Sequence, residues 1–352
     1  MLRLVPTTRY QGSKRKILPW LYDNFNDLEF STVLDGFGGT GSVSYLLKRM
    51  GKRVTFNDIL ASNCLTGIAL IENDSVKLDK EDIDFLLHEN GFTYRSFIRD
   101  TFKGIYYRQD ENKLLDIMTL NIKMLSEKYD GEILSRKQAL AYHVLFQACL
   151  CKRPFNLFHR KNLSLRTSRK VERTFGNKKT WDTSFRKLLL KFNDEVSQKI
   201  FSNEQKNKAI CGDIMKIRNK SFDLVYLDPP YMRLDEKKPK DYHSLYHFLD
   251  GLTDYDNWAQ KIDLNTKNRR LIKEENLWDS NSMEDNFDAL FRKFKDSIIV
   301  VSYGEPGNPP ISKIKELLSR YKTRVKIVKK EYKYRLNRGN GHGLYEVLII
   351  GE

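Results

Sequence analysis

Two groups of residues in the sequence have the types and spacing to do chemistry. The first is the glycine-rich turn at residues 35–42, DGFGGTGS, which satisfies the pattern G-x-G-x-x-G. Glycine lets the backbone turn sharply and lets a ligand approach it closely. Asp58 ends the next apolar segment, and a carboxylate there can accept both hydroxyls of an adenosine ribose. The pattern is typical of a site for NAD, FAD or S-adenosylmethionine.

The second group is the tetrapeptide Asp-Pro-Pro-Tyr at residues 228–231, which follows the apolar segment 222–227, FDLVYL. Two prolines remove two backbone donors and fix the chain, so the strand cannot continue. The carboxyl ends of strands are the edge where open α/β sheets bind ligands. A carboxylate and rigid carbonyls accept hydrogen bonds from a planar amine, and an aromatic ring stacks on a flat base. The candidate catalytic residues are Asp228, Pro229, Pro230 and Tyr231.

These residues need strands and helices to hold them. Residues 31–35 predict a strand, residues 42–50 a helix with one apolar face, and residues 53–56 a second strand. This order is a βαβ unit. Residues 62–200 are mostly helical by the spacing of their apolar residues, which is clearest in three stretches, 83–87, 114–128 and 137–150. Such a block indicates a helical insertion into the α/β domain.

The α/β pattern returns near residue 208. Besides residues 222–227, an apolar strand is expected at residues 297–302. Residues 325–328 and 345–350 flank a glycine-rich turn and predict an antiparallel hairpin at the end of the sheet. Residues 232–296 are polar and give few signals, so we expect a long loop with short helices there.

Composition excludes several classes of protein. Of the 352 residues, 40% are hydrophobic and 12% aromatic, which suffices for a core and argues against global disorder. No apolar run of about 18 residues predicts a membrane span, and the first residues lack a signal-peptide core. The cysteines form no CxxC pair, so we expect buried reduced thiols and no metal site. They are Cys64, Cys149, Cys151 and Cys211.

The net charge of +16 points to a polyanionic partner. Residues 136–191 hold 15 Lys and Arg against 2 acidic residues, and residues 322–338 hold 8 against 1. A solvated helix face usually mixes both signs, which these runs do not. Contact with the phosphates of a nucleic acid is the favoured interpretation.

Residues 8–14, TRYQGSK, the glycine-rich turn, Asp58 and the DPPY tetrapeptide occur in an order that resembles the Dam-like (alpha-class) DNA adenine-N6 methyltransferases. The resemblance implies a Rossmann-like, S-adenosylmethionine-dependent methyltransferase fold of the α/β class, with a mixed sheet and a C-terminal antiparallel hairpin. Residues 1–61 and 195–352 would form the catalytic domain, and residues 62–194 a basic, mostly helical target-recognition domain. The sequence departs from many relatives in having Tyr-Gln-Gly-Ser where they carry Trp-Ala-Gly-Gly.

The resemblance also implies roles for single residues. Tyr10 and Lys14 would contact or cover the methionine end of S-adenosylmethionine, and Asp58 would hold its ribose. Asp228 and the Pro229 carbonyl would hold the target amine. Taken alone, Lys14 could be a surface lysine, which is the less favoured interpretation. The implied cofactor residues are Tyr10, Lys14, Asp35, Phe37, Gly39, Thr40, Gly41, Asp58, Asp213, Ile214 and Asp228, with Asp213 and Ile214 at the adenine; Tyr231 would stack on the flipped base.

Residues 149–167, CLCKRPFNLFHRKNLSLRT, resemble the DNA-contacting segment of the family. The partner implied is double-stranded DNA, with no membrane, in the cytoplasm of a prokaryotic or phage-infected cell. We expect a monomer or weak dimer, and the sequence leaves open whether a cognate restriction endonuclease accompanies it. The implied DNA-contacting residues are Arg153, Asn156, Arg160, Lys161, Asn162, Arg166 and, in the C-terminal turn, Arg338.

The function expected is site-specific transfer of a methyl group from S-adenosylmethionine to the exocyclic N6 amine of an adenine flipped out of duplex DNA. Three alternatives stay open. The same pocket could serve an RNA adenine, or the fold could be a degenerate one that only binds nucleic acid. A NAD-dependent oxidoreductase would fit the glycine-rich turn but would give no role to DPPY or to the basic insert.

Overall fold

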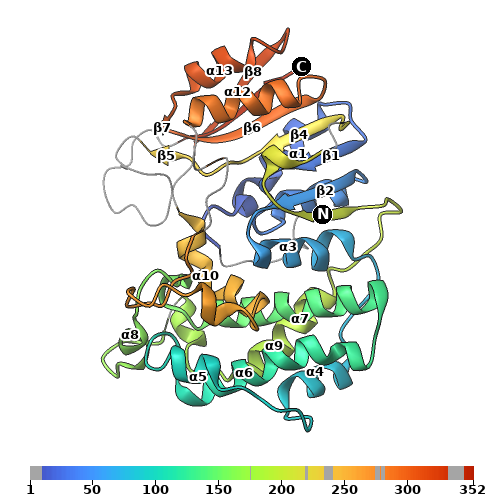
Figure 1. Cartoon of the computed structure of the whole chain (residues 1–352). Coiled ribbons are helices and arrows are strands. Elements are labelled where there is room, and N and C mark those ends of the chain that lie inside the picture. Colours follow the sequence, from blue (N-terminus) through green and yellow to red (C-terminus); the bar gives the residue numbers. More distant parts are fainter. Residues whose placement is uncertain are drawn as a thin grey trace.

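The computed structural model describes residues 10–174, 176–218, 221–233, 241–273, 278, 282–331 and 345–352. A seven-stranded sheet with the order β3-β2-β1-β4-β6-β9-β8 lies at its centre (Figure 1). The first five strands of that order are parallel, and β9 runs antiparallel to both β6 and β8. The strands are β1 (Thr32–Asp35), β2 (Arg53–Asp58), β3 (Lys208–Cys211), β4 (Leu224–Leu227), β6 (Ile298–Glu305), β8 (Val325–Glu331) and β9 (Tyr345–Gly351).

Helices flank the sheet and form a layer beside it. Figure 1 shows this layer below the sheet, with α3 between the two. A separate pair of short strands, β5 (Met232–Arg233) and β7 (Gly307–Asn308), follows DPPY and β6. The helices are α1 (Leu18–Asn26), α2 (Ser42–Arg49), α3 (Ala61–Gly67), α4 (Lys80–Leu87), α5 (Phe97–Thr101), α6 (Gln109–Met124), α7 (Gly131–Cys151), α8 (Leu163–Thr167), α9 (Phe185–Ser197), α10 (Tyr242–Thr253), α12 (Met283–Lys293) and α13 (Ile311–Leu318).

The central strands are apolar because both faces of the sheet are covered. All four residues of β4 are buried, as expected for a parallel strand inside an α/β sheet. Its side chains alternate between two cores: Tyr226 packs in the cluster that includes α1 and α2, and Val225 in the cluster that includes α12 and α13. The α/β prediction, with its mixed sheet and C-terminal antiparallel strands, is therefore confirmed.

The predicted helical insert is also observed. Helix α7 lies at its centre and packs against both α3 and α9. Helix α10 lies in the stretch where we had expected a long loop with short helices within the catalytic domain, and it packs into this layer. The Phe248 ring of α10 meets the Phe102 ring edge-on at 5.0 Å, and the Phe158 amide donates to the Leu245 carbonyl at 2.9 Å. The layer is thus built from two separate segments of the chain.

The structure corrects one expectation about the cysteines. Cys64 in α3 and Cys211 at the end of β3 form a disulfide, whereas we had expected reduced thiols. Cys149 and Cys151 in α7 are buried free thiols. Among the described helices, none combines the length and the apolar character needed to cross a membrane.

Candidate active site

A cavity of about 360 Å³ opens at the carboxyl ends of β1, β2 and β4. Strand β1 lies between β2 and β4, so the connections leave it toward opposite sides, and this is the switch point where open α/β sheets bind ligands. Gly41 does not line the cavity; with φ of 71° it begins α2 instead. Every other predicted catalytic or cofactor residue lines the cavity: Tyr10, Lys14, Asp35, Phe37, Gly39, Thr40, Asp58, Asp213, Ile214, Asp228, Pro229, Pro230 and Tyr231.

The glycine-rich turn forms one wall of the cavity. The Gly38 amide donates to the Asn57 carbonyl at 2.8 Å, which holds the turn against the end of β2. A Cβ atom added at Gly38 would overlap the Phe56 ring, so only glycine allows this close approach. Gly39 has φ of 52°, a conformation that side chains disfavour. At Gly38 and Gly39 the turn therefore presents bare backbone to the cavity.

Two buried carboxylates lie beside this turn. Asp58 accepts hydrogen bonds from the amides of Gly39 (2.8 Å, Oδ2) and Leu60 (2.9 Å, Oδ1), and burial raises its pKa to about 6. Asp35 accepts from Ser44 Oγ at 2.6 Å through Oδ2, and burial raises its pKa to about 7. Asp35 Oδ1 is buried and accepts no hydrogen bond from the described residues. The cavity thus offers acceptor atoms to a ligand.

Tyr10 is stacked on a helix that the sequence analysis did not find. Its ring lies parallel to those of Tyr246 and Tyr242 in α10, with centroids at 4.1 Å and 5.7 Å. Tyr242 also lines the cavity, and the Gln11 amide donates to the Tyr246 hydroxyl at 2.8 Å. The two tyrosines are four residues apart, a helical spacing that could have indicated a shared face. Helix α10 therefore closes one side of the site.

The Nζ atom of Lys14 lies between two carboxylates of the protein, although the residue also lines the cavity. It is 2.9 Å from Asp228 Oδ1 and 2.9 Å from Glu346 Oε1. Burial acts to lower the pKa of Lys14, but the two carboxylates outweigh it and raise that pKa well above its usual value. Burial raises the pKa of Asp228 to about 6; Lys14 opposes this rise and Glu346 adds to it. Sequence analysis had not singled out Glu346.

Tyr231 packs near the carboxyl end of strand β6 in the same sheet. Its ring is 4.7 Å from the ring of Tyr303 in β6, tilted by 41°. A Cβ atom added at Gly304 would overlap the tip of Tyr231, so glycine leaves the room that this ring occupies. The tetrapeptide Asp228–Tyr231 and Asp58 thus line the same cavity.

Comparison with known proteins identifies the family of this chain. The family model of D12 class N6 adenine-specific DNA methyltransferases matches residues 10–303, which is more than half of the chain. The chain belongs to this family. It is 26% identical over 341 residues to the Type II methyltransferase M2.HphI of Haemophilus parahaemolyticus, covering 94% of this chain and 93% of the relative. It is 24% identical over 375 residues to the modification methylase LlaI of Lactococcus lactis subsp. lactis, covering 97% and 54%.

The enzyme is therefore an adenine-specific DNA methyltransferase, as the resemblance predicted. The family assignment does not favour the alternatives of an RNA adenine substrate or a degenerate fold. Asp58, Asp228 and Tyr231 also all line the cavity.

Two arginines predicted to touch DNA are buried in this methyltransferase. Arg153 is fully buried and donates to the carbonyls of Leu157 (3.1 Å) and Arg160 (3.2 Å), and burial lowers its pKa to about 10. Arg166 is fully buried as well. Direct contact of these two side chains with DNA does not fit this structure, because protein groups surround them. Their contacts instead shape the segment.

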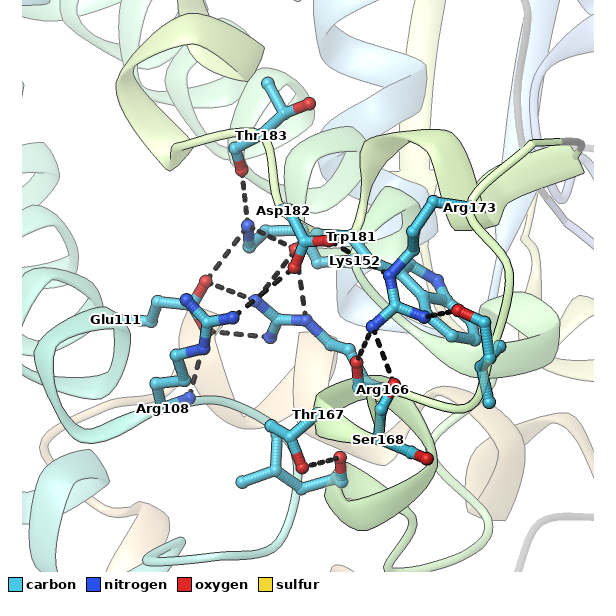
Figure 2. Close-up of polar contacts among 12 residues, drawn as sticks. Arg108, Glu111, Lys152, Arg166, Thr167, Ser168, Arg173, Trp181, Asp182 and Thr183 are labelled. Atoms are coloured by element: carbon cyan, nitrogen blue, oxygen red, sulfur yellow. Dashed lines mark hydrogen bonds and ion pairs between the residues drawn. The ribbon is translucent and has the colours of Figure 1, made fainter.

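Figure 2 shows the network around Arg166. Arg166 forms a two-pronged ion pair with Glu111, with Nη1 at 2.7 Å from Oε2 and Nη2 bonded to Oε1. Lys152 Nζ lies 2.9 Å from Glu111 Oε1 and also donates to the carbonyls of Trp181 and Thr183. Burial acts to raise the pKa of Glu111, but the two cations outweigh it and lower that pKa. Part of the basic run is thus neutralised inside the helical layer.

The remaining predicted DNA residues differ in exposure. Arg160 and Lys161 are exposed, and Asn156 and Asn162 are half-buried. Arg338 lies outside the described residues. The backbone is unusual at the start of this segment. Phe155 and Asn156 have φ of 62° and 58°, and Phe155 is 67% exposed. An exposed aromatic ring on disfavoured backbone is a candidate functional feature.

We expect Arg166→Met to destabilise the methyltransferase by roughly 3 kcal/mol, because breaking a buried ion pair leaves a buried charge poorly compensated. Urea unfolding followed by circular dichroism measures this change. Arg169→Met is the matched control: Arg169 is exposed, lies three residues away and should change the free energy of unfolding by less than about 0.5 kcal/mol. Equal stability of the two variants would contradict a structural role for Arg166.

Proposed function

We propose that this methyltransferase binds S-adenosylmethionine in the cavity and methylates the N6 amine of a flipped-out adenine at a specific site in duplex DNA. The observation that carries the proposal is the shared cavity. Asp58, the carboxylate expected to hold the ribose, and the Asp228–Tyr231 tetrapeptide line the same space. The names of the two relatives, a Type II methyltransferase and a modification methylase, support a modification role within a restriction–modification system.

The residues around the cavity fit S-adenosylmethionine. A volume of about 360 Å³ is in the range of small-molecule sites. Three carboxylates, the buried Asp35 and Asp58 and the half-buried Asp228, line the cavity and favour a cationic ligand. Asp35 Oδ1 is a buried acceptor to which no described residue donates a hydrogen bond. Asp58 can accept further hydrogen bonds, because each carboxylate oxygen has two lone pairs. When bound, S-adenosylmethionine supplies an electrophilic sulfonium methyl, whose bond to sulfur breaks as adenine N6 bonds to the carbon.

The protein positions the amine for this reaction. The lone pair of adenine N6 is delocalised into the ring, so the amine is a poor nucleophile. We propose that Asp228 Oδ2 and the Pro229 carbonyl accept hydrogen bonds from the two N–H groups of this amine. These hydrogen bonds favour a pyramidal nitrogen with its lone pair available. The proton that N6 loses leaves along the hydrogen bond to Asp228. The Tyr231 ring stacks on the base, and fixed geometry with fixed charges supplies the rate enhancement.

An adenine within a duplex cannot reach this cavity. The base must leave the stack, at a cost of about a few kcal/mol, before Asp228 can meet its amine. The surface beside the cavity must therefore bind the duplex while the base is outside it. We propose that the segment of residues 155–162, which carries Phe155, Arg160 and Lys161, is part of this surface, with arginine and lysine on phosphates. Phe155 would contact bases through its exposed ring.

A second element extends the proposed DNA surface. Residues 261–273 form a small hairpin closed by an antiparallel bridge between Ile262 and Leu271. Asn268 fixes the hairpin to the first segment: its Nδ2 donates to the Phe158 carbonyl at 3.1 Å, and its own carbonyl accepts from the Tyr106 hydroxyl at 2.8 Å. Lys273, at the base of the hairpin, lines the cavity. The hairpin thus lies beside both the segment and the site.

The side chains of this hairpin suit DNA. Lys267 is exposed, and Leu264 beside it is 66% exposed. A basic side chain beside an apolar one matches the phosphates and base edges of a groove. Sequence analysis missed the hairpin because residues 232–296 have a slightly acidic balance overall, which hides the local basic cluster.

Asp58→Asn should weaken S-adenosylmethionine binding by about tenfold to hundredfold, the effect of losing a hydrogen bond to a charged group. Isothermal titration calorimetry measures the dissociation constant, and NAD should show no binding to the wild-type enzyme. Asp296→Asn, an exposed carboxylate just before β6, is the control and should bind as the wild type does. Tight NAD binding would contradict the proposed cofactor.

Asp228→Asn should lower kcat by at least about a hundredfold, because the amide cannot replace the ionised acceptor of the amine. S-adenosylmethionine and DNA should still bind within a few-fold of the wild type. The measurement is single-turnover methyl transfer to unmethylated genomic DNA, followed by mapping of the modified bases. Full activity of this variant would overturn the scheme.

Lys161→Gln and Lys267→Gln should each weaken duplex binding and reduce the salt dependence of log Kd by about one unit of slope, as expected when one phosphate contact is lost. Fluorescence anisotropy of a labelled duplex at several salt concentrations gives both values. Lys80→Gln is the control, because exposed Lys80 begins α4, well away from α8 in Figure 1. If all three variants share the wild-type slope, neither segment contacts phosphates.

A further inference from the structure

Three charged side chains from distant parts of the sequence meet beside the active site, and two of them are buried. Lys14 Nζ lies 2.9 Å from Asp228 Oδ1 and 2.9 Å from Glu346 Oε1. The Lys14 and Glu346 side chains are only 9% and 2% exposed, and that of Asp228 is 18% exposed, on the cavity side. One ammonium thus bridges the predicted catalytic carboxylate and a second carboxylate that no motif indicated.

Glu346 is fixed more firmly than its two partners. It lies in β9, which pairs along its length with β6 on one side and β8 on the other. Its Oε1 also accepts a hydrogen bond from Ser302 Oγ of β6 at 2.7 Å. Lys14, by contrast, carries its charge at the end of a flexible four-carbon stem, in the short 3-10 helix Lys14–Ile17. Glu346 therefore anchors the lysine, and not the reverse.

We propose that Glu346 is a positioning residue for methyl transfer, acting through Lys14. It keeps the Lys14 ammonium on Asp228 Oδ1, which fixes the rotation of that carboxylate and directs Oδ2 to the target amine. The inference rests on the proposed role of Asp228.

The second carboxylate also sets the charge of the cluster. Lys14 with Asp228 alone would be a neutral pair, whereas Lys14, Asp228 and Glu346 together carry a net charge of about −1. Adenine N6 gains positive charge as it attacks the methyl group. A net negative cluster stabilises that charge, and a low-dielectric surrounding strengthens the effect. Lys14 can therefore orient Asp228 without cancelling its charge.

The arrangement makes opposite predictions for its two supporting residues. Lys14 lowers the pKa of Asp228 and Glu346 raises it, on top of the rise that burial causes. Methyl transfer needs the ionised Asp228, so the rate falls as pH drops through this pKa. This fall is the acidic limb of the pH–rate profile. Loss of the Glu346 charge moves the acidic limb to lower pH, and loss of the Lys14 charge moves it to higher pH. The titratable groups around Asp228 are Lys14, Glu346, Tyr226, Tyr231 and Asp35.

The test is the pH profile of single-turnover methyl transfer, at saturating S-adenosylmethionine and DNA, for Glu346→Gln and Lys14→Met. For Glu346→Gln we expect a plateau rate lower by about tenfold to hundredfold and an acidic limb shifted down by about one pH unit. For Lys14→Met we expect a limb shifted up by about one unit. DNA affinity should change little in either variant.

Controls separate a positioning role from a structural one. Glu316→Gln removes the same charge from exposed Glu316 in α13 and should leave the profile unchanged. Glu346→Asp keeps a carboxylate at the same backbone position and should keep the wild-type limb. If Glu346→Gln only lowers the melting temperature and leaves the limb in place, the inference is wrong.

The outcomes also separate this inference from the proposed function. An inactive wild-type enzyme would sink the proposed function itself. An active wild type whose acidic limb moves in neither variant would overturn the role of Glu346 alone. Should Glu346→Gln fail to fold, Lys14→Met still tests the link through which Glu346 acts, and the absence of the upward shift in Lys14→Met contradicts the proposal.

Discussion

Burial of carboxylates at the carboxyl ends of adjacent parallel strands is the constraint on which the rest of the site depends. Burying a charge without partners is costly, so Asp35, Asp58 and Asp228 must each find compensation. Ser44 bonds to the first, the amides of the glycine-rich turn and of Leu60 to the second, and Lys14 to the third. The groups that compensate the charges also line or border the cavity, so its shape and its electrostatics arise together.

The helical layer also compensates its buried charges, but there the charges in excess are positive and the compensating groups are acids. A run of basic residues would repel itself if all of it faced water, and part of it is turned inward onto acids from outside the run. Glu111 in α6 holds both Lys152 and Arg166, and Asp82 in α4 holds Lys137. The positive charge left at the surface is therefore smaller and more localised than the sequence total suggests.

Helix α10 connects these two parts of the methyltransferase. At its start, Tyr242 faces the cavity beside Tyr10, and further along, Phe248 packs among the aromatic rings of the helical layer. Asp250 also accepts a hydrogen bond from the Ser62 amide of α3 at 2.9 Å. One helix thus contacts the cavity wall, helix α3 and the helical layer.

Local physics explains what the sequence could determine by itself. Apolar runs that end in Asp35, Asp58 and Asp228 marked the strand ends, glycines marked the close approach, and helical periodicity marked the insert, because each depends on neighbours in the chain. The partners of Lys14 and the burial of Arg166 depend on residues far away in sequence, as do the place of α10 and the disulfide at Cys64. Charge and spacing are silent about such pairs, because an ammonium or guanidinium looks alike on a surface and inside a core. Only the tertiary fold decided which basic side chains meet acids within the protein and which remain exposed at the surface.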